Sequence, residues 1–231
     1  MFLKVLRSAA LLLTGMAALP AGAYADDALY DTGPSQDSSY VRFVNATDAT
    51  VTITGQAGAK IDLPAGDNAR ATRFQPVKAG KALAAAVTAA GGTENVTVTV
   101  ASGEFATVVV TGGAAAKPAV TVLKEQPSDF NALKSSLAFY NMDGACPSAG
   151  LVAGANNTPV FTGQALGTFA RREVNPIAIG VAALCGAAPA GNAVDLGQLA
   201  AGGRYSIFLV ATGVNGHHLF SVKDATSTFK K

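Results

Sequence analysis

The chain has 231 residues, of which 49% are hydrophobic and 14% are charged, with 25 glycines and no tryptophan. This much apolar material is enough to fold, so the composition argues against a disordered or low-complexity protein. The formal net charge is +2, and it falls to 0 when Lys4 and Arg7, which lie in a predicted leader, are left out. We therefore expect no nucleic-acid partner, because neutralising phosphates needs a clustered excess of Lys and Arg.

The N-terminal 25 residues read as a secretory signal peptide. Two early cations precede an apolar run over 8–19, Pro20 ends that run, and 21–23 and 23–25 both offer an A-x-A cleavage site. We predict cleavage after Ala25, which leaves a polar N-terminal segment over 26–39. The alternative, a retained membrane anchor, is disfavoured because an uninterrupted apolar span of about 20 residues is absent. We expect an exported mature chain that does not span a membrane.

Short strands are predicted through the rest of the chain. Apolar and polar residues alternate near 41–44, 51–53 and 96–100, and the run over 105–111 is almost wholly apolar. Period-two alternation is typical of a half-buried strand, and a short continuous apolar run is typical of a strand buried on both faces. A glycine- and proline-containing loop leads into a further strand over 119–123. Long helical periodicity is not evident.

The sequence repeats itself. Residues 136–141 (SLAFYN) match 40–45 (YVRFVN) at an offset of 96, which places Asn45 over Asn141. Further matches, 74–80 with 174–180 and 102–110 with 202–210, have an offset of 100. Two units of about 100 residues with many short strands predict an all-β fold of two tandem antiparallel β-sandwiches of immunoglobulin-like size.

The repeat also predicts the domain organisation. We place the first sandwich at 40–124, a linker at 125–134 and the second sandwich at 135–231. The second sandwich holds the cysteines of the chain, Cys146 and Cys185. A metal site needs more ligands than two, and a redox-active pair is usually spaced C-x-x-C. In an oxidising compartment, we therefore predict that the two cysteines form a structural disulfide.

The sequence gives little indication of a catalytic site. Acyl transfer or hydrolysis needs a nucleophile within reach of a base. The histidines, His217 and His218, fall in what reads as a hairpin turn, and no serine lies in a G-x-S-x-G sequence. Adjacent residues of a strand point to opposite faces, so the two histidines are poorly placed to share one ion. We expect no catalytic residue, no metal ion and no cofactor.

The candidate contact residues are Tyr30, Arg171, Arg172, Glu173 and Asn175. The charged cluster over 171–173 is either a solvated edge or turn with local ion pairs, or a contact for an acidic partner or polyuronate, because guanidinium groups bind carboxylates bidentately. Tyr30, ahead of the first strand, either covers an apolar seam or anchors a partner by β-strand addition.

Several segments together resemble one known family. They are ALY at 28–30, SSYVRFVNAT at 38–47, the stretch across the predicted linker at 120–141, and RREVNPIAIGVAAL at 171–184. The chain resembles the alginate O-acetylation accessory protein (AlgF) family, and RREVNP and the ALY start are the most specific parts of this likeness.

The resemblance implies a periplasmic protein with two domains like carbohydrate-binding modules. It implies a role in O-acetylation of a secreted exopolysaccharide, alginate or a related polymer such as cellulose, beside a membrane acetyl-carrier protein and periplasmic SGNH-type acetyltransferases. The catalytic serine belongs to those partners, so the chain is expected to be an adaptor and not an enzyme. The alternative is a carbohydrate-binding module that holds the polysaccharide, with weak affinity because the sequence has no Trp and only five Tyr.

Overall fold

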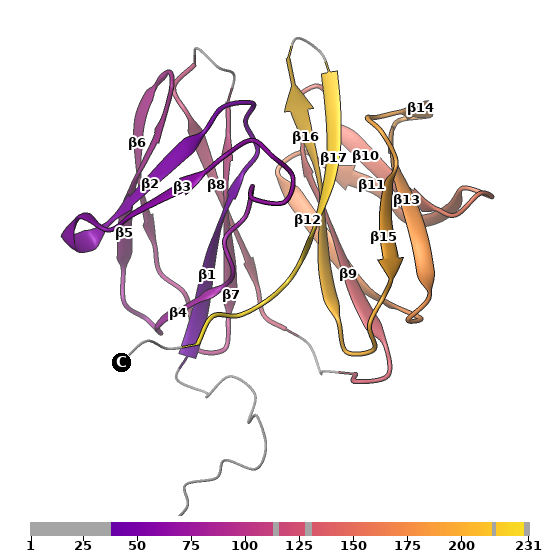
Figure 1. Cartoon of the computed structure of the whole chain (residues 1–231), viewed down its shortest axis with the longest axis horizontal. Helices are drawn as coiled ribbons and strands as arrows, with labels where there is room; N and C mark the ends of the chain where they lie inside the picture. The colour runs from indigo at the N-terminus through magenta and orange to yellow at the C-terminus, as the bar shows by residue number, and fades with distance from the viewer. Residues whose placement is uncertain (1–37, 113–115, 128–130, 214–215, 229–231) are drawn as a thin grey trace, which may run out of the picture. The chain divides into compact units, whose positions relative to one another are not determined.

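The computed structural model describes residues 38–112, 116–127, 131–213 and 216–228 (Figure 1). The predicted signal peptide, most of the polar segment that follows it, and Tyr30 lie outside the described residues. Within the described ranges, no helix has the length and hydropathy that a membrane span requires. The described residues belong to one compact unit.

The first repeat forms a sandwich of two four-stranded sheets. Its inner sheet has the order β4-β1-β7-β8 and its outer sheet the order β3-β2-β5-β6. A short 3-10 helix, η1 (Gln56–Gly58), connects β2 to β3. The strands are β1 (Ser38–Asn45), β2 (Val51–Gly55), β3 (Lys60–Leu63), β4 (Gln75–Lys78), β5 (Leu83–Ala89), β6 (Gly92–Val98), β7 (Phe105–Thr111) and β8 (Ala119–Glu125).

The second repeat forms a similar sandwich. Its inner sheet has the order β12-β9-β16-β17, and its outer sheet has the order β11-β10-β13-β14, with β15 also paired to β13. The strands are β9 (Ser135–Met142), β10 (Ser148–Ala153), β11 (Thr158–Ala165), β12 (Thr168–Val174), β13 (Ala178–Cys185), β14 (Ala188–Pro189), β15 (Val194–Gln198), β16 (Arg204–Thr212) and β17 (Gly216–Lys223).

The prediction of an all-β fold with two tandem sandwiches is confirmed, and the two inner sheets have the same topology. The outer sheets are antiparallel throughout, and each inner sheet contains one parallel pair, β1 with β7 in the first repeat and β9 with β16 in the second. A parallel pair needs a long crossover connection, and here the strands of the outer sheet supply it. The junction between the repeats runs from the end of β8 at Glu125 to the start of β9 at Ser135.

The register of the last match differs from the sequence prediction by one residue. In the parallel pairs, Tyr40 lies opposite Phe105, and its counterpart Ser136 lies opposite Arg204. Phe105 therefore corresponds to Arg204 and not to Tyr205, an offset of 99 instead of 100. Strands β7 and β16 are buried on both faces, so their apolar runs lack the alternation that would have fixed the register.

The match of 74–80 with 174–180, which places Pro76 over Pro176, is also wrong. Pro76 pairs with Tyr40, whereas the residue that pairs with Ser136 is Glu173. Pro176 lies beyond the end of β12, in the connection to β13. The proline that the two segments share is a chance likeness. Neither 74–80 nor 174–180 has an alternation of apolar and polar residues that would fix how the two segments align.

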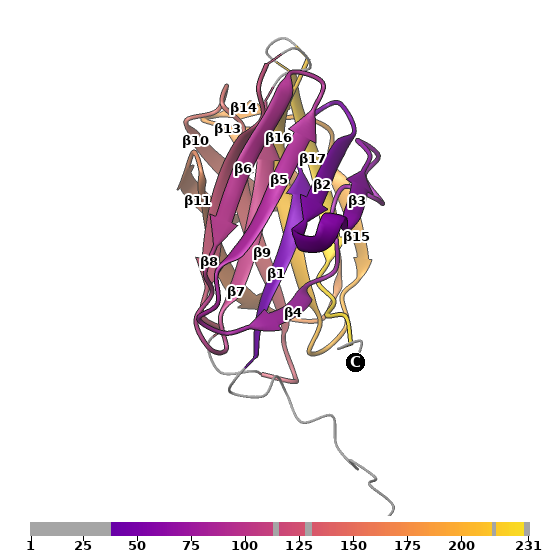
Figure 2. The same cartoon turned by 90° about the vertical axis from the view of Figure 1, so that its left-hand side faces the viewer.

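Four sheets stack in sequence, with three apolar layers between them. Figure 1 shows the sheets nearly edge-on, and Figure 2 shows the outer sheet of the first sandwich in front. Buried clusters around Phe43 and Phe139 form the cores of the two sandwiches. A third buried cluster, which includes Val44, Tyr140 and Phe208, lies between the two inner sheets. The inner sheets therefore bury both of their faces.

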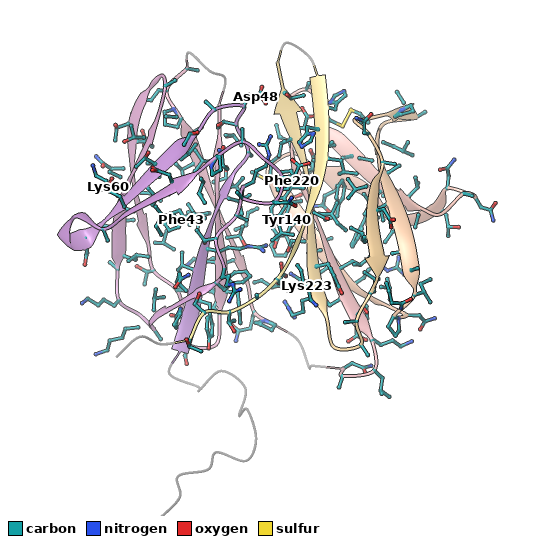
Figure 3. All side chains as sticks on the ribbon, in the orientation of Figure 1. Phe43, Asp48, Lys60, Tyr140, Phe220 and Lys223 are labelled. Atoms are coloured by element: carbon teal, nitrogen blue, oxygen red, sulfur yellow. A yellow bond between two sulfur atoms is a disulfide. The ribbon has the colours of Figure 1, made fainter. Side chains whose placement is uncertain are left out.

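Stacked aromatic rings make up much of the layer between the sandwiches. Ring centroids lie 4.8 Å apart for Tyr140 and Phe169, 4.4 Å for Tyr140 and Phe208, and 5.1 Å for Phe208 and Phe220. Tyr140 and Phe220 lie at the centre of the molecule in Figure 3. Large apolar interfaces restrict relative domain motion, so we infer that the two sandwiches move as one body.

The repeated asparagine has the same role in both sandwiches. Asn45, at the end of β1, donates from Nδ2 to the carbonyl oxygen of Leu63 in β3 at 2.8 Å. Asn141, near the end of β9, donates from Nδ2 to the carbonyl oxygen of Gln164 in β11 at 3.0 Å. Both side chains are buried and bond further loop backbone groups. Each asparagine thus ties an inner sheet to its outer sheet.

Cys146 and Cys185 are joined by a disulfide, with Cα atoms 5.5 Å apart. It fastens the loop after β9 to the end of β13, so it links the inner and outer sheets of the second sandwich. Closing a loop of this size stabilises a fold by about 4 kcal/mol in the chain-entropy model.

We expect Asn45→Ala and Asn141→Ala each to lower the free energy of unfolding by about 2–4 kcal/mol, because each leaves buried backbone groups without a partner. Urea denaturation of the purified mature chain measures this change. Asn95→Ala, at an exposed position on β6, is the matched control. Losses no larger than that of the control would contradict the tie between the sheets.

Candidate functional site

A buried arginine of the first repeat crosses the layer between the sandwiches. Arg42 lies on β1, is 1% exposed, and points away from the core of its own sandwich toward the second repeat. Its Nη1 bonds Asp224 Oδ1 at 2.7 Å, its Nη2 donates to Ser206 Oγ at 2.8 Å, and its Nε donates to Thr107 Oγ1 at 3.0 Å. The guanidinium also lies 4.4 Å from the ring centroid of Phe74. The charge is therefore buried but fully partnered.

The ion pairs continue from Asp224 toward the surface. Arg171 Nη2 lies 3.1 Å from Asp224 Oδ2, and Arg171 Nε lies 2.5 Å from Glu125 Oε1. Arg204 Nη2 donates to the same Glu125 oxygen at 3.0 Å. We call Arg42, Asp224, Arg171, Glu125 and Arg204 the seam network. It draws on both repeats, because Arg42 and Glu125 belong to the first and the others to the second.

Charge within the seam network shifts the pKa of two of its members, Asp224 and Arg171. Burial opposes ionisation of Asp224, but Arg42 and Arg171 outweigh burial and lower the pKa of this carboxyl. Burial also opposes the charge on Arg171, but Asp224 and Glu125 outweigh it and raise the pKa of this guanidinium. Both groups are therefore held in their charged forms.

A pocket of about 240 Å³ opens beside the outer end of the seam network. Four cationic and two anionic side chains line it, so the charge of its lining is +2. The lining also contains amide, hydroxyl and glycine backbone groups. The residues are Glu125, Gln126, Asn131, Lys134, Ser136, Phe169, Arg171, Arg172, Glu173, Gly202, Gly203 and Arg204.

A second, more apolar hollow of about 440 Å³ adjoins the pocket. Arg172 lines both, and Lys134 Nζ, in the pocket, donates to Asn175 Oδ1, in the hollow, at 2.6 Å. Ile177, 53% exposed, lies in the lining of the hollow. We call the pocket and the hollow together the β11–β12 surface. The hollow is lined by Ala153, Gly154, Thr158, Pro159, Val160, Arg172, Val174, Asn175, Ile177, Ala178, Ile179 and Gly180.

The structure brings Arg171, Arg172 and Glu173 together in the lining of the pocket, but it gives the two arginines different environments. Arg171, with a side chain 12% exposed, belongs to the seam network. Arg172, Glu173 and Asn175 are exposed on the β11–β12 surface. Tyr30 lies outside the described residues. Successive residues of a strand point to opposite faces, which is why the two adjacent arginines have different environments.

Arg42 and Asp224 were missed by the sequence analysis. The sequence did contain one signal, because Arg42 lies inside a predicted strand with an apolar neighbour on each side. A cation buried at such a position requires a partner of opposite charge. That partner lies 182 residues away in the sequence, and local spacing gives no indication of it.

The histidines are not turn residues, because His217 and His218 pair with β16 as part of β17. His217 Nδ1 lies 2.6 Å from Oδ2 of the buried Asp143, within the second sandwich. His218 Nε2 lies 2.7 Å from Asp67 Oδ1, in a turn of the first sandwich. The two rings thus have separate partners. In the described ranges no three His, Cys, Asp or Glu side chains gather as metal ligands.

A second polar contact holds the sandwiches together at the opposite end of the seam, where Figure 3 labels Asp48. Asp48 accepts hydrogen bonds from the backbone N–H of Gly213 at 2.7 Å and from Thr212 Oγ1 at 2.8 Å. The Gly213 N–H is the main reason that the pKa of Asp48 is lowered. Polar contacts therefore flank the aromatic layer at both ends.

No family model matches this sequence, and no curated protein matches it. Among solved structures, the chain is similar to CBMbc, a family CBM26 module of Amy13K from Eubacterium rectale, in complex with maltoheptaose. The identity is 8%, the TM-score is 0.26, and the match covers 81% of this chain and 97% of that chain. A likeness at this level carries no argument about function.

We expect Asp224→Asn to lower the free energy of unfolding by about 3–5 kcal/mol at neutral pH, because it leaves two buried guanidinium groups without their shared carboxylate. The folded-state pKa of Asp224 is lowered, so its contribution is present above the unfolded pKa of about 3.9 and is lost as the pH falls through the folded value.

Urea denaturation from pH 7 to pH 2 measures this dependence. The difference between wild type and Asp224→Asn should be constant above about pH 5 and shrink below about pH 4. Asp62→Asn, at an exposed aspartate, is the control. A difference that is independent of pH would show that Asp224 is not held as a carboxylate by its neighbours.

The adjacent arginines should respond differently to truncation. Arg171→Ala should lower the free energy of unfolding by about 3 kcal/mol, because it breaks two buried ion pairs. Arg172→Ala should change it by less than about 0.5 kcal/mol, because that side chain is exposed. The same unfolding measurement applies to both variants, and equal losses would contradict the assignment of Arg171 to the seam network.

Proposed function

We propose that this chain is a non-catalytic periplasmic adaptor for O-acetylation of a secreted exopolysaccharide, alginate or a related polymer such as cellulose. Its partners in this proposal are periplasmic SGNH-type acetyltransferases and the membrane acetyl-carrier protein. The proposal starts from the resemblance to the AlgF family, and the position of the residues that carry this resemblance supports it.

One observation carries the proposal. The segment RREVNP, together with the isoleucine that follows it, contributes exposed side chains of Arg172, Glu173, Asn175 and Ile177 to the β11–β12 surface. Folding does not require a large apolar side chain in solvent beside exposed charges. Distinctive residues that are not used for packing support a role in recognition.

The layer between the sandwiches supports an adaptor with a fixed shape. Arg42, Asp48 and the stacked rings around Tyr140 hold the two repeats together. A partner bound on one sandwich is therefore held at a defined position relative to a partner bound on the other. This property suits a protein that organises enzymes along a polymer.

The positions of the tyrosines favour an adaptor over a protein that mainly holds glycan. Tyr40, Tyr140 and Tyr205 are all buried, at 9%, 1% and 7% exposure. Sugar-binding surfaces commonly present an aromatic ring face to the sugar. Among the described residues, no tyrosine ring is presented in this way.

We expect a tagged mature protein to recover the SGNH-type acetyltransferases from periplasmic extract of the native cells, identified by mass spectrometry. Arg172→Glu should reduce their recovery several-fold, because it reverses a charge on the β11–β12 surface. Arg73→Glu, at an exposed arginine of the first repeat, is the matched control. Failure of the wild-type protein to recover any acetyltransferase would contradict the adaptor function.

A further inference from the structure

The β11–β12 surface lies at the edge of the second sandwich. β12 is the end strand of the inner sheet, and β11 is the end strand of the outer sheet. Arg172 bridges them, because its Nη1 donates to the carbonyl oxygen of Val160 at 2.7 Å. Sheet edges are common docking sites for extended segments of a partner chain.

The pocket half of this surface is suited to a carboxylate. Glu125 is already paired with two guanidinium groups, so Glu173 is the one carboxylate of the lining without such a pair among the described residues. The ammonium group of Lys134 has three N–H donors, and its hydrogen bond to Asn175 uses one of them. Lys134 and Arg172 thus contribute positive charge to the lining of the pocket. The pocket is too small for a drug-sized ligand but has room for one charged side chain.

The hollow half is suited to aliphatic side chains. Apolar groups of Pro159, Val160, Val174, Ile177 and Ile179 line it. Ile177 is one of the most exposed large apolar residues in the described chain. The hollow has no aromatic ring in its lining, so it offers aliphatic packing in place of a flat platform for a sugar.

We propose that an extended segment of a protein partner docks along the β11–β12 surface, with an acidic side chain in the pocket and aliphatic side chains in the hollow. This inference rests on the proposed adaptor function and gives the chemistry of the partner at this site. Positive charge beside an aliphatic hollow is complementary to an acidic residue flanked by aliphatic residues, and electrostatic complementarity of this kind sets partner specificity.

The test uses peptides instead of a native partner. A random library of peptides about ten residues long is selected on the immobilised mature protein. We expect a consensus of Asp or Glu near aliphatic residues, and binding that weakens as salt is raised. For a selected peptide, Lys134→Ala, Arg172→Ala and Ile177→Ser should each weaken binding by about tenfold in calorimetry.

Matched control variants lie on the first repeat. Lys60→Ala, Arg73→Ala and Ile61→Ser change exposed residues of the same types and should leave peptide binding unchanged. Thermal unfolding confirms that each variant is folded. A selection that enriches no sequence, a consensus without an acidic residue, or equal losses in test and control variants would overturn the inference.

Two further outcomes separate this inference from the adaptor function. Acetyltransferase recovery that survives the combined Lys134→Ala and Arg172→Ala changes would overturn the inference and leave the adaptor function intact. Peptide binding as described, without recovery of any acetyltransferase, would support the peptide-docking role of the β11–β12 surface and contradict the adaptor function.

Short hexuronate oligosaccharides are titrated in parallel. Oligosaccharide binding that displaces the peptide and is lost in the same variants would overturn the inference and assign the β11–β12 surface to glycan instead.

Discussion

The ion pair between Arg42 and Asp224 is the constraint on which the arrangement of the two sandwiches depends. An unpaired charge in this apolar layer would cost several kcal/mol, so the packing of the inner sheets is most stable when the carboxylate meets the guanidinium. Beyond Asp224 the chain returns to the first sandwich and pairs with Phe74. The N–H of Phe74 donates to the carbonyl oxygen of Ala225 at 2.9 Å, and the N–H of Ser227 donates to the carbonyl oxygen of Phe74 at 2.8 Å. The apolar layer supplies the contact area, and the ion pair determines how the two surfaces fit together.

Much of the fold could be predicted from the sequence, because half-buried strands alternate and the repeat reveals two similar units. The register of β7 and β16 could not. Both strands face a core on one side and the layer between the sandwiches on the other, so their apolar runs carry no period. The sequence showed that these strands were buried, but not that the second buried face belongs to an interface with the other repeat.

The candidate site could be predicted only in part, for a related reason. The charged cluster at Arg171 and Arg172 was visible, and so was the fact that neighbours on a strand point to opposite faces. Which arginine points inward depends on Glu125 and Asp224, 46 and 53 residues from Arg171 in the sequence. The β11–β12 surface is formed by Arg172, the arginine that points outward, together with the apolar residues that follow it.

The order of Arg42 and Asp224 along the chain has a consequence for biogenesis. Synthesis proceeds from the N-terminus, so the first repeat, with Arg42, is complete long before the carboxylate that neutralises it has been made. Until Asp224 has been made, the nascent protein carries the unpaired guanidinium of Arg42 on an inner sheet that no second sandwich covers. A chain whose synthesis stops before this aspartate would keep that sheet exposed and be open to proteolysis.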